Sequence, residues 1–326
     1  MSPSQDKRRA LTPEALSMMD TIARSGSFAA AAREMGRVPS ALTYSVRQLE
    51  DALDVLLFDR SSRQAVLTSA GQELLHEGRR LLQELDAVAN RVRRISTGWE
   101  SELTLAIDDA IARRAVFDLM EAFYAEKIEG GGPPPTRLKL RVEVLAGTWE
   151  ALLHGQADVA IGVPAQLQNS SIHCEFGGEL EFAFCVAPHH PLAGLPEPLT
   201  AAQIAEHRII AVADSARLLT PLTVGLLPGQ DVLTVPSLAT KLEVMMRGLG
   251  CGSLPVPIVR RHIEAGRLVR KATYEGRRTG KMHYAWRENS AGSGHAPGKA
   301  LAWWINKLRG PATQRALLEQ HEGLLL

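Results

Sequence analysis

The sequence of 326 residues has only three cysteines, Cys174, Cys185 and Cys251. They form no CxxC motif, and none stands with histidine at a spacing typical of a metal site. We therefore expect neither a disulfide framework nor a bound metal. We expect the cysteines to be buried and inert, with a redox switch as the alternative. So few scattered thiols fit a reducing cytoplasm.

The sequence also has no excess of charge of one sign. It contains 37 Lys+Arg and 36 Asp+Glu, a formal net charge of +1 at pH 7. This balance excludes a globally basic nucleic-acid binder and an acidic disordered chain. It is compatible with a local basic surface, because charge acts where it is clustered.

Long apolar runs and catalytic motifs are absent as well. No stretch of about 18 apolar residues could cross a membrane, and Met1–Ala10 is polar, so we expect neither export nor a membrane partner. The sequence has no nucleophile elbow, no glycine-rich phosphate loop and no HExxH motif. His189 and His190 lie between prolines without a carboxylate at a useful spacing, which predicts a loop. We expect a protein that is not an enzyme and needs no cofactor.

The chain changes character near Ser96–Gly98. The residues before this point are helix-rich, and those after it alternate short apolar runs with helical stretches, which is typical of an α/β fold with a largely parallel sheet. The length fits two or three domains. The apolar runs are Leu103–Ile107, Leu138–Val144, Val159–Val163, Phe182–Val186 and Ile209–Val212.

The first part of the chain predicts a helix-turn-helix. A first helix covers Leu11–Arg24, Ser27 caps a second over Phe28–Met35, and Pro39 opens a third after a turn at Gly36. The buried stripe of the third helix is Leu42, Val46, Leu49 and Leu53.

The opposite face of the third helix carries side chains that can contact bases or phosphates. Leu56–Phe58 and Ala65–Leu67 flank a segment over Asp59–Gln64 that resembles a wing. The alternative is a small helical domain whose third helix is merely amphipathic. The predicted DNA-binding residues are Ser27, Arg37, Pro39, Ser40, Thr43, Tyr44, Arg47, Arg60 and Arg63. We expect the acidic residues among them, Glu50, Asp51 and Asp54, to limit non-specific attraction to DNA.

A long helix is predicted from the cap Thr68 to about Ile95. Apolar residues recur at the two positions per heptad that form a coiled-coil seam, which favours self-association. Gly78 should weaken this helix by about 1 kcal/mol relative to alanine. The alternative is a helix that packs on its own domain. The seam residues are Leu74, Leu81, Leu85, Val88, Val92 and Ile95.

These segments resemble the LysR-type transcriptional regulators. The resemblance implies an α/β protein with an N-terminal winged helix-turn-helix (residues 1–67), a linker helix (68–97) and a two-lobed effector domain like that of periplasmic binding proteins (98–326). Lobe I would hold about 98–180 and 286–326, and lobe II about 181–285. The motifs that carry the resemblance are Ser25–Phe28, Ala31–Ala32, Ala41–Thr43, Leu49–Glu50, Leu57–Arg60, Leu67–Gly71, Ala187–Ala193 and Gly248–Pro255.

Two departures from the family pattern affect the recognition helix. Family members often have Ser-Gln where this chain has Val38–Pro39, so a base contact by that glutamine is not carried over. They usually have glycine at Asp54, and aspartate tolerates a left-handed backbone better than most residues.

The resemblance implies a sequence-specific DNA-binding regulator set by a small-molecule effector between the lobes. Its expected partners are double-stranded promoter DNA, the effector and a second copy of the chain, with tetramers and RNA polymerase as further expectations. The alternative is a cytoplasmic solute-binding or interaction protein with a helical dimerisation module.

The effector site is expected at the strand ends and helix starts that line the cleft. Two adjacent carboxylates, Asp108 and Asp109, would repel an anion, which favours a cationic or polar neutral effector with Trp149 as a cation–π face. The alternative is that one of them caps the next helix. The predicted residues are Asp108, Asp109, Ala110, Thr148, Trp149, Asp214, Ser215 and Ser237. Trp303 and Trp304 point about 100° apart on a helix, so one should pack on the sheet.

Overall fold

The computed structural model describes residues 10–59, 65–129, 131–164, 172–287 and 297–321. The chain divides into two compact units, Met1–Arg91 and Val92–Leu326. None of the helices in these described stretches has the length and apolar character that a membrane span requires.

The first unit is a helix-turn-helix in which the second, third and long helices begin where the sequence predicts, and the first begins two residues later than predicted, at Pro13. The Thr12 and Ser27 hydroxyls accept hydrogen bonds from the Ala15 and Ala30 N–H groups, and Thr68 Oγ1 accepts from Gly71 N at 3.0 Å. Such side-chain caps satisfy backbone donors that the first turn leaves free. The helices are α2 (Pro13–Ser25), α3 (Phe28–Glu34), α4 (Pro39–Leu53) and α5 (Ser69–Thr97).

The core of this unit confirms the predicted stripe of α4. Leu42, Val46 and Leu49 are buried, and Leu53 is half-buried against them. Asp54 ends α4 with φ 58° and ψ 39°, so the left-handed turn is kept without glycine. The other buried members of the core are Met18, Met19, Ile22, Ala31, Ala32, Leu57 and Phe58.

The predicted wing is held at its base by an isolated antiparallel bridge. Phe58 pairs with Leu67 in an antiparallel bridge, and Asp59 N donates to Val66 O at 2.8 Å. Its tip, with Arg60 and Arg63, lies outside the described residues.

Glu50 stabilises the base of the wing through hydrogen bonds. Its side chain is buried, and its carboxylate accepts a hydrogen bond from Leu57 N at 2.8 Å. Glu50 therefore has a structural role that the sequence did not predict, and the expectation that it limits attraction to DNA stays a prediction. Asp51 and Asp54 are exposed.

Replacing Glu50 with alanine should lower the free energy of unfolding of the N-terminal unit by about 1–3 kcal/mol, because buried backbone N–H groups lose their acceptor. Thermal unfolding of the full chain, followed by circular dichroism, measures this loss. Asp51→Ala, an exposed neighbour, is the matched control and should change stability by less than about 0.5 kcal/mol. Equal stability of the two variants would contradict the structural role of Glu50.

The first turns of α5 pack on the helix-turn-helix. Leu74 contacts its core, and a Cβ on Gly78 would lie 2.9 Å from Leu16 Cδ2. Gly78 therefore permits a close approach between α5 and α2. Leu74 packs on the core of its own domain, so its assignment to the seam is wrong. Leu81, Leu85 and Val88 are 44%, 49% and 43% exposed. The side chains of Val92 and Ile95 lie outside the described part of the chain.

The second unit is built on a mixed sheet of seven strands in the order β2-β1-β3-β9-β4-β7, with β8 also paired to β4. A smaller sheet pairs β5 with β6. The strands are β1 (Glu102–Asp108), β2 (Arg137–Glu143), β3 (Val159–Pro164), β4 (Ile172–Val186), β5 (Ile209–Val212), β6 (Val232–Val235), β7 (Gly252–Pro255), β8 (Val269–Arg270) and β9 (Arg278–Arg287).

The prediction of a largely parallel sheet is wrong. β1 is parallel to β2 and β3, and β5 to β6, but every strand paired with β4 or β9 is antiparallel to it. The predicted apolar runs correspond to β1, β2, β3, β5 and the end of β4, whereas the short strands β6, β7 and β8 were not predicted. The first part of β4 and the whole of β9 mix polar and apolar residues, so they produced no apolar run.

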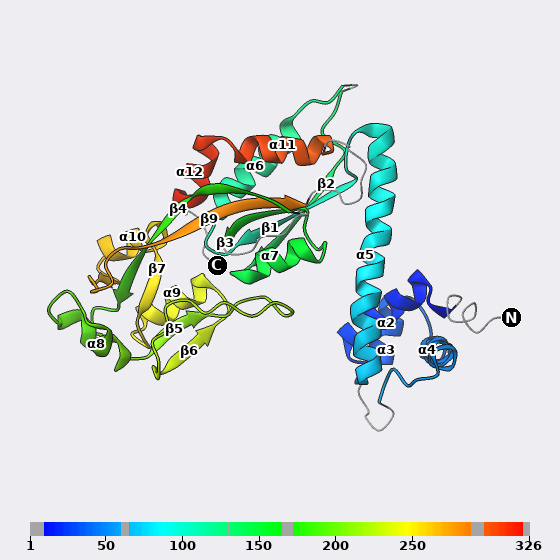
Figure 1. The fold of residues 1–326 in the computed structure, drawn as a ribbon, viewed down its shortest axis with the longest axis horizontal. Helices are drawn as coiled ribbons and strands as arrows, with labels where there is room; N and C mark the ends of the chain where they lie inside the picture. The colour runs from blue at the N-terminus through cyan, green and yellow to red at the C-terminus, as the bar shows by residue number, and fades with distance from the viewer. Residues whose placement is uncertain (1–9, 60–64, 130, 165–171, 288–296, 322–326) are drawn as a thin grey trace. The chain divides into compact units, whose positions relative to one another are not determined.

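Helices cover both faces of the larger sheet, with α6, α11 and α12 on one side and α7 on the other (Figure 1). Alternation along β1 explains this: Leu103, Leu105 and Ile107 enter the core beneath α6 and α11, whereas Ala106 faces α7. The helices are α6 (Arg113–Ala125), α7 (Ala146–Leu153), α8 (Ala201–Ala205), α9 (Leu238–Met246), α10 (Val256–Glu264), α11 (Lys299–Leu308) and α12 (Pro311–Glu319), with a 3₁₀ turn η1 (Pro191–Gly194).

The second unit has two lobes connected by β4 and β9 (Figure 1). One lobe holds β1, β2 and β3, and the other holds β5, β6 and β7 with α8, α9 and α10. The lobe boundaries expected from the sequence, 180/181 and 285/286, fall inside β4 and β9.

Candidate functional site

The outer face of α4 presents a row of polar side chains. Ser40, Thr43, Tyr44 and Arg47 are all exposed, and Tyr44 is 64% exposed. Thr43 Oγ1 donates to Pro39 O at 3.0 Å, and the Tyr44 hydroxyl accepts from Gln48 Nε2 at 3.1 Å. The helix thus keeps its apolar residues in the core and offers donors and acceptors outward, as a helix that reads a major groove requires.

Of the other predicted DNA-binding residues, Arg37, Pro39 and Ser27 lie in the described part of the chain, whereas Arg60 and Arg63 do not. Arg37 is exposed in the turn before α4, and Pro39 is its exposed first residue. Ser27 is half-buried and its hydroxyl caps α3, accepting from Ala30 N at 3.2 Å. Arg24, also at this surface, is already paired with Glu34.

The second unit contains a cavity of about 1060 Å³ lined by both lobes. This volume is sufficient for a small organic molecule. Lobe I contributes the end of β1 and Leu145, and lobe II contributes α9 and the loops around it. Most of the apolar lining comes from lobe II and from β4, through Phe182, Phe184, Leu199, Ile204, Leu226 and Leu227.

The paired carboxylates at the end of β1 line this cavity but are satisfied by hydrogen bonds. Asp108 accepts from the N–H groups of Ala110 at 2.9 Å and Leu145 at 2.8 Å, and its burial raises its pKa to about 7. Asp109 accepts from Arg113 Nη2 at 2.7 Å and from Leu238 N at 2.6 Å.

Asp109 therefore bridges the lobes, because Leu238 is the first residue of α9. The helix that follows the aspartates, α6, has Ala112 at its N-cap and no side-chain cap. The alternative that Asp108 or Asp109 caps the next helix is wrong, since Asp109 instead binds the start of α9. The premise for a cationic effector is also weakened, because neither carboxylate is free.

The remaining predicted effector residues do not all reach the cavity. Ala110 lines it, whereas Thr148 and Trp149 are buried. Trp149 packs with Ala106 and Leu152 between α7 and the sheet, so the prediction that it offers a cation–π face is wrong. Small side chains on β1 leave room for the indole beneath α7.

Asp214, Ser215 and Ser237 hold backbone segments near the cavity. Asp214 Oδ2 accepts from Ala146 N at 3.1 Å and from Leu222 N at 2.7 Å. Ser215 Oγ accepts from Val144 N at 2.9 Å, and Ser237 Oγ caps α9 by accepting from Thr240 N at 3.1 Å. None of the three is among the residues lining the cavity.

The cationic side chains that line the cavity were not predicted, and two of them, Lys241 and Arg278, lie close to each other. Lys241 of α9 is 8% exposed, and its burial, with the positive charge of Arg278, lowers its pKa to about 8. The sequence does indicate that Lys241 is buried, because it stands three residues after Leu238 and four before Met245, on the apolar side of its helix. A lysine is almost never fully buried unless it is paired with an opposite charge.

None of the other groups considered in the sequence lines the cavity; these are the cysteines, His190 and Trp304. Cys185 and Cys251 are buried as expected, and burial raises the pKa of their thiols to about 12 and about 11. The expectation of burial is wrong for Cys174, which is exposed. His190 is buried and its Nδ1 accepts from Leu192 N at 3.2 Å. Trp304 is fully buried, as expected for one of the two adjacent tryptophans.

A helix-turn-helix unit followed by a two-lobed domain with a cavity lined by both lobes defines a ligand-responsive transcription regulator. Two family models match the chain: "Bacterial regulatory helix-turn-helix protein, lysR family" over residues 13–72 and "LysR substrate binding domain" over residues 96–309. The chain belongs to the LysR family of transcriptional regulators.

Relatives and solved structures agree with this assignment. The chain is 39% identical to the probable HTH-type transcriptional regulator YhaJ of Escherichia coli K12, covering 93% of this chain and 97% of YhaJ. It is 36% identical to the uncharacterized HTH-type transcriptional regulator YeeY of the same organism, covering 90% and 92%. Full-length CbnR in complex with its target DNA shares the fold, with a TM-score of 0.59, 17% identity, and coverage of 91% and 99%.

Proposed function

We propose that this protein is an effector-controlled, homodimeric DNA-binding regulator in which α4 enters the major groove. The observation that carries the proposal is the exposed polar face formed by Ser40, Thr43, Tyr44 and Arg47 on a helix whose other side is core. Arg47 would bind a guanine edge bidentately, and the shorter side chains would contact bases or the DNA backbone.

Two chains would be joined through α5, so that two recognition helices meet successive major grooves of a nearly palindromic operator. The exposed Leu81, Leu85 and Val88 support this pairing. The proposed division is a DNA-binding domain over 1–67, a linker over 68–97 and an effector domain over 98–326. Assembly of dimers into tetramers, contact with RNA polymerase and a cytoplasmic location belong to the same proposal.

The effector would occupy the cavity between the lobes and shift the balance between lobe arrangements. Such a shift requires different affinities for the different arrangements. The Asp109–Leu238 hydrogen bond at 2.6 Å supports this idea, because it connects the end of β1 in one lobe to the start of α9 in the other.

A gel-shift assay tests the proposal with the DNA upstream of the protein's own gene and a shuffled duplex of equal composition. The regulator should prefer the upstream DNA, and its affinity should fall by about 10³–10⁵-fold between about 50 and 200 mM salt if six to ten phosphates are contacted. A solute-binding protein with a helical dimerisation module would bind neither duplex selectively, and that result would refute the proposal.

A further inference from the structure

Several charged side chains in the cavity wall already have partners, and Glu275, Arg277 and Lys281, for which the described residues provide no ion pair, are exposed to solvent. Asp109 is paired with Arg113, and Arg270 with Glu181 at 2.8 Å. Lys271 Nζ lies 3.1 Å from Glu197 and also donates to Leu195 O at 2.8 Å. These pairs need no ligand to balance their charge.

Lys241 differs from these residues. Among the described residues, its ammonium has no hydrogen-bond acceptor and no carboxylate within ion-pair distance, although the side chain is 8% exposed and lines the cavity. A buried cation without an anion is unfavourable, which is why burial lowers its pKa. An anion from solution would satisfy it.

The neighbouring strand leaves space for this ammonium. Gly252 begins β7 beside α9, and a Cβ there would lie 3.1 Å from Lys241 Cε and 3.2 Å from Nζ. Ser253, the next residue, also lines the cavity and offers a hydroxyl. Because residue 252 is glycine, no side chain there crowds the ammonium group of Lys241.

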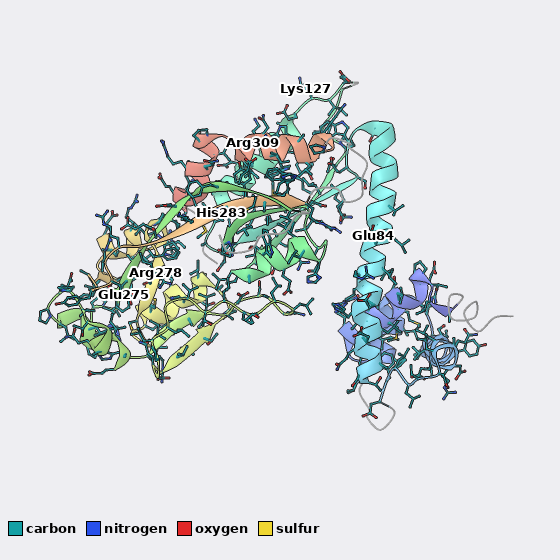
Figure 2. All side chains as sticks on the ribbon, in the orientation of Figure 1. Glu84, Lys127, Glu275, Arg278, His283 and Arg309 are labelled. Atoms are coloured by element: carbon teal, nitrogen blue, oxygen red, sulfur yellow. The ribbon has the colours of Figure 1, made fainter. Side chains whose placement is uncertain are left out.

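A second cation without an anion lies close to Lys241. Arg278 begins β9, in the lobe that contains α8, α9 and α10 (Figure 2). It has no ion pair within the described part of the chain, and its charge contributes to the lowered pKa of Lys241. Two cations that repel each other across a cavity raise the electrostatic potential where an anion would bind.

Apolar side chains surround this pair of cations. Phe182 and Phe184 of β4, with Leu199, Ile204 and Leu226, form much of the remaining wall. A simple inorganic anion would leave these surfaces in contact with water. An organic anion with an aromatic or aliphatic body would cover them and gain the free energy of apolar burial.

We infer that the effector is an amphiphilic organic anion whose charged group binds Lys241 and Arg278 and whose apolar body packs against Phe182 and Phe184. The inference rests on the proposed function and specifies its effector class. It replaces the cationic effector expected from Asp108 and Asp109, whose carboxylates are already satisfied within the protein.

A pair of fluorescent probes tests the inference on the purified full chain. 8-Anilino-1-naphthalenesulfonate carries a permanent anion on an aromatic body, and N-phenyl-1-naphthylamine is the same body without the sulfonate. Lys241→Met should weaken binding of the sulfonate by about tenfold, the size of one charge-assisted hydrogen bond, and leave the neutral probe unchanged. Lys241→Arg should retain the sulfonate affinity, and Lys127→Met, at an exposed lysine outside the cavity, should equal the unsubstituted chain.

The pH dependence gives a second readout. Lys241 loses its proton above its pKa of about 8, so sulfonate binding should weaken as the pH rises through that value. The thiols of Cys185 and Cys251 also face Lys241 and stay neutral there, because burial raises their pKa to about 12 and about 11, and Arg278 is the charged side chain beside it. Asp108, with its pKa of about 7, titrates in every variant. Lys241→Arg should therefore lack only the weakening near pH 8.

The inference is overturned if the unsubstituted chain shows no saturable sulfonate binding, or if Lys241→Met binds the sulfonate as tightly as the unsubstituted chain. Circular dichroism shows whether each variant is folded. Gel-shift affinity measured on the same samples separates the two proposals: retained selective DNA binding with unchanged probe binding rejects the anionic effector alone. Loss of selective DNA binding by the unsubstituted chain rejects the regulator.

Discussion

Replacing Leu85 with lysine is expected to convert the dimer into a monomer and to lower the affinity for a two-half-site operator by about 10²–10⁴-fold, the contribution of a linked second site. Leu85 is 49% exposed, one turn from Leu81 and about one turn from Val88. Three large apolar side chains on one face of a helix are covered when two such helices pair. A lysine there would place a charge in the seam of each helix.

Size-exclusion chromatography with light scattering measures the mass of the Leu85→Lys variant, and a gel-shift assay measures its affinity. Asp86→Asn is the matched control, because it changes the net charge by the same amount at an exposed neighbouring position. It should remain a dimer with unchanged affinity. A Leu85→Lys protein that keeps both the dimer mass and the DNA affinity would show that α5 does not form the seam.

Replacing Arg47 with alanine should weaken binding to the operator by about 1–3 kcal/mol, roughly 5- to 150-fold, if the guanidinium binds a base. Arg47 is exposed on α4, and no ion pair holds it within the described residues. Its guanidinium is therefore free to form two parallel hydrogen bonds to guanine. A smaller side chain would leave both acceptors of the base without a protein donor.

The salt dependence distinguishes a base contact from a phosphate contact. Loss of a base contact should relax specificity at one operator position and leave the salt slope unchanged. Loss of a phosphate contact should weaken binding to all sequences and reduce the slope by about 0.9. Arg80→Ala, at an exposed arginine on α5 that is paired with Glu77, is the control and should bind like the unsubstituted chain. Equal affinity of the Arg47→Ala variant would exclude Arg47 from the interface.

The helix-turn-helix was predictable because local signals determine it. Ser27 and Thr68 satisfy the first N–H groups of their helices, and the apolar residues of α4 recur at helical spacing. These signals act within four residues along the chain. They specify where a helix begins and which face is buried, whatever the rest of the protein does.

The packing of α5 and the order of the strands in the sheet depend on contacts between residues that are distant in the sequence. Leu74 belongs to the heptad pattern, but it packs on the core that the earlier helices build. The first part of β4 and the whole of β9 mix polar and apolar residues, and they are recognisable as strands only through their antiparallel pairing with each other. Neither partner can be identified from the residues of one segment.

The sequence by itself determined the family, the recognition helix and the exposed face that Arg47 shares with Ser40, Thr43 and Tyr44. Periodicity and capping are short-range, and they are visible in a single chain. Only the tertiary structure decided which charges in the cavity are free. It showed that Asp109 is bound to Arg113 and α9, whereas Lys241 faces the cavity beside Arg278. The free energy of a charge depends on the partners that folding brings near it, and those partners are distant in the sequence.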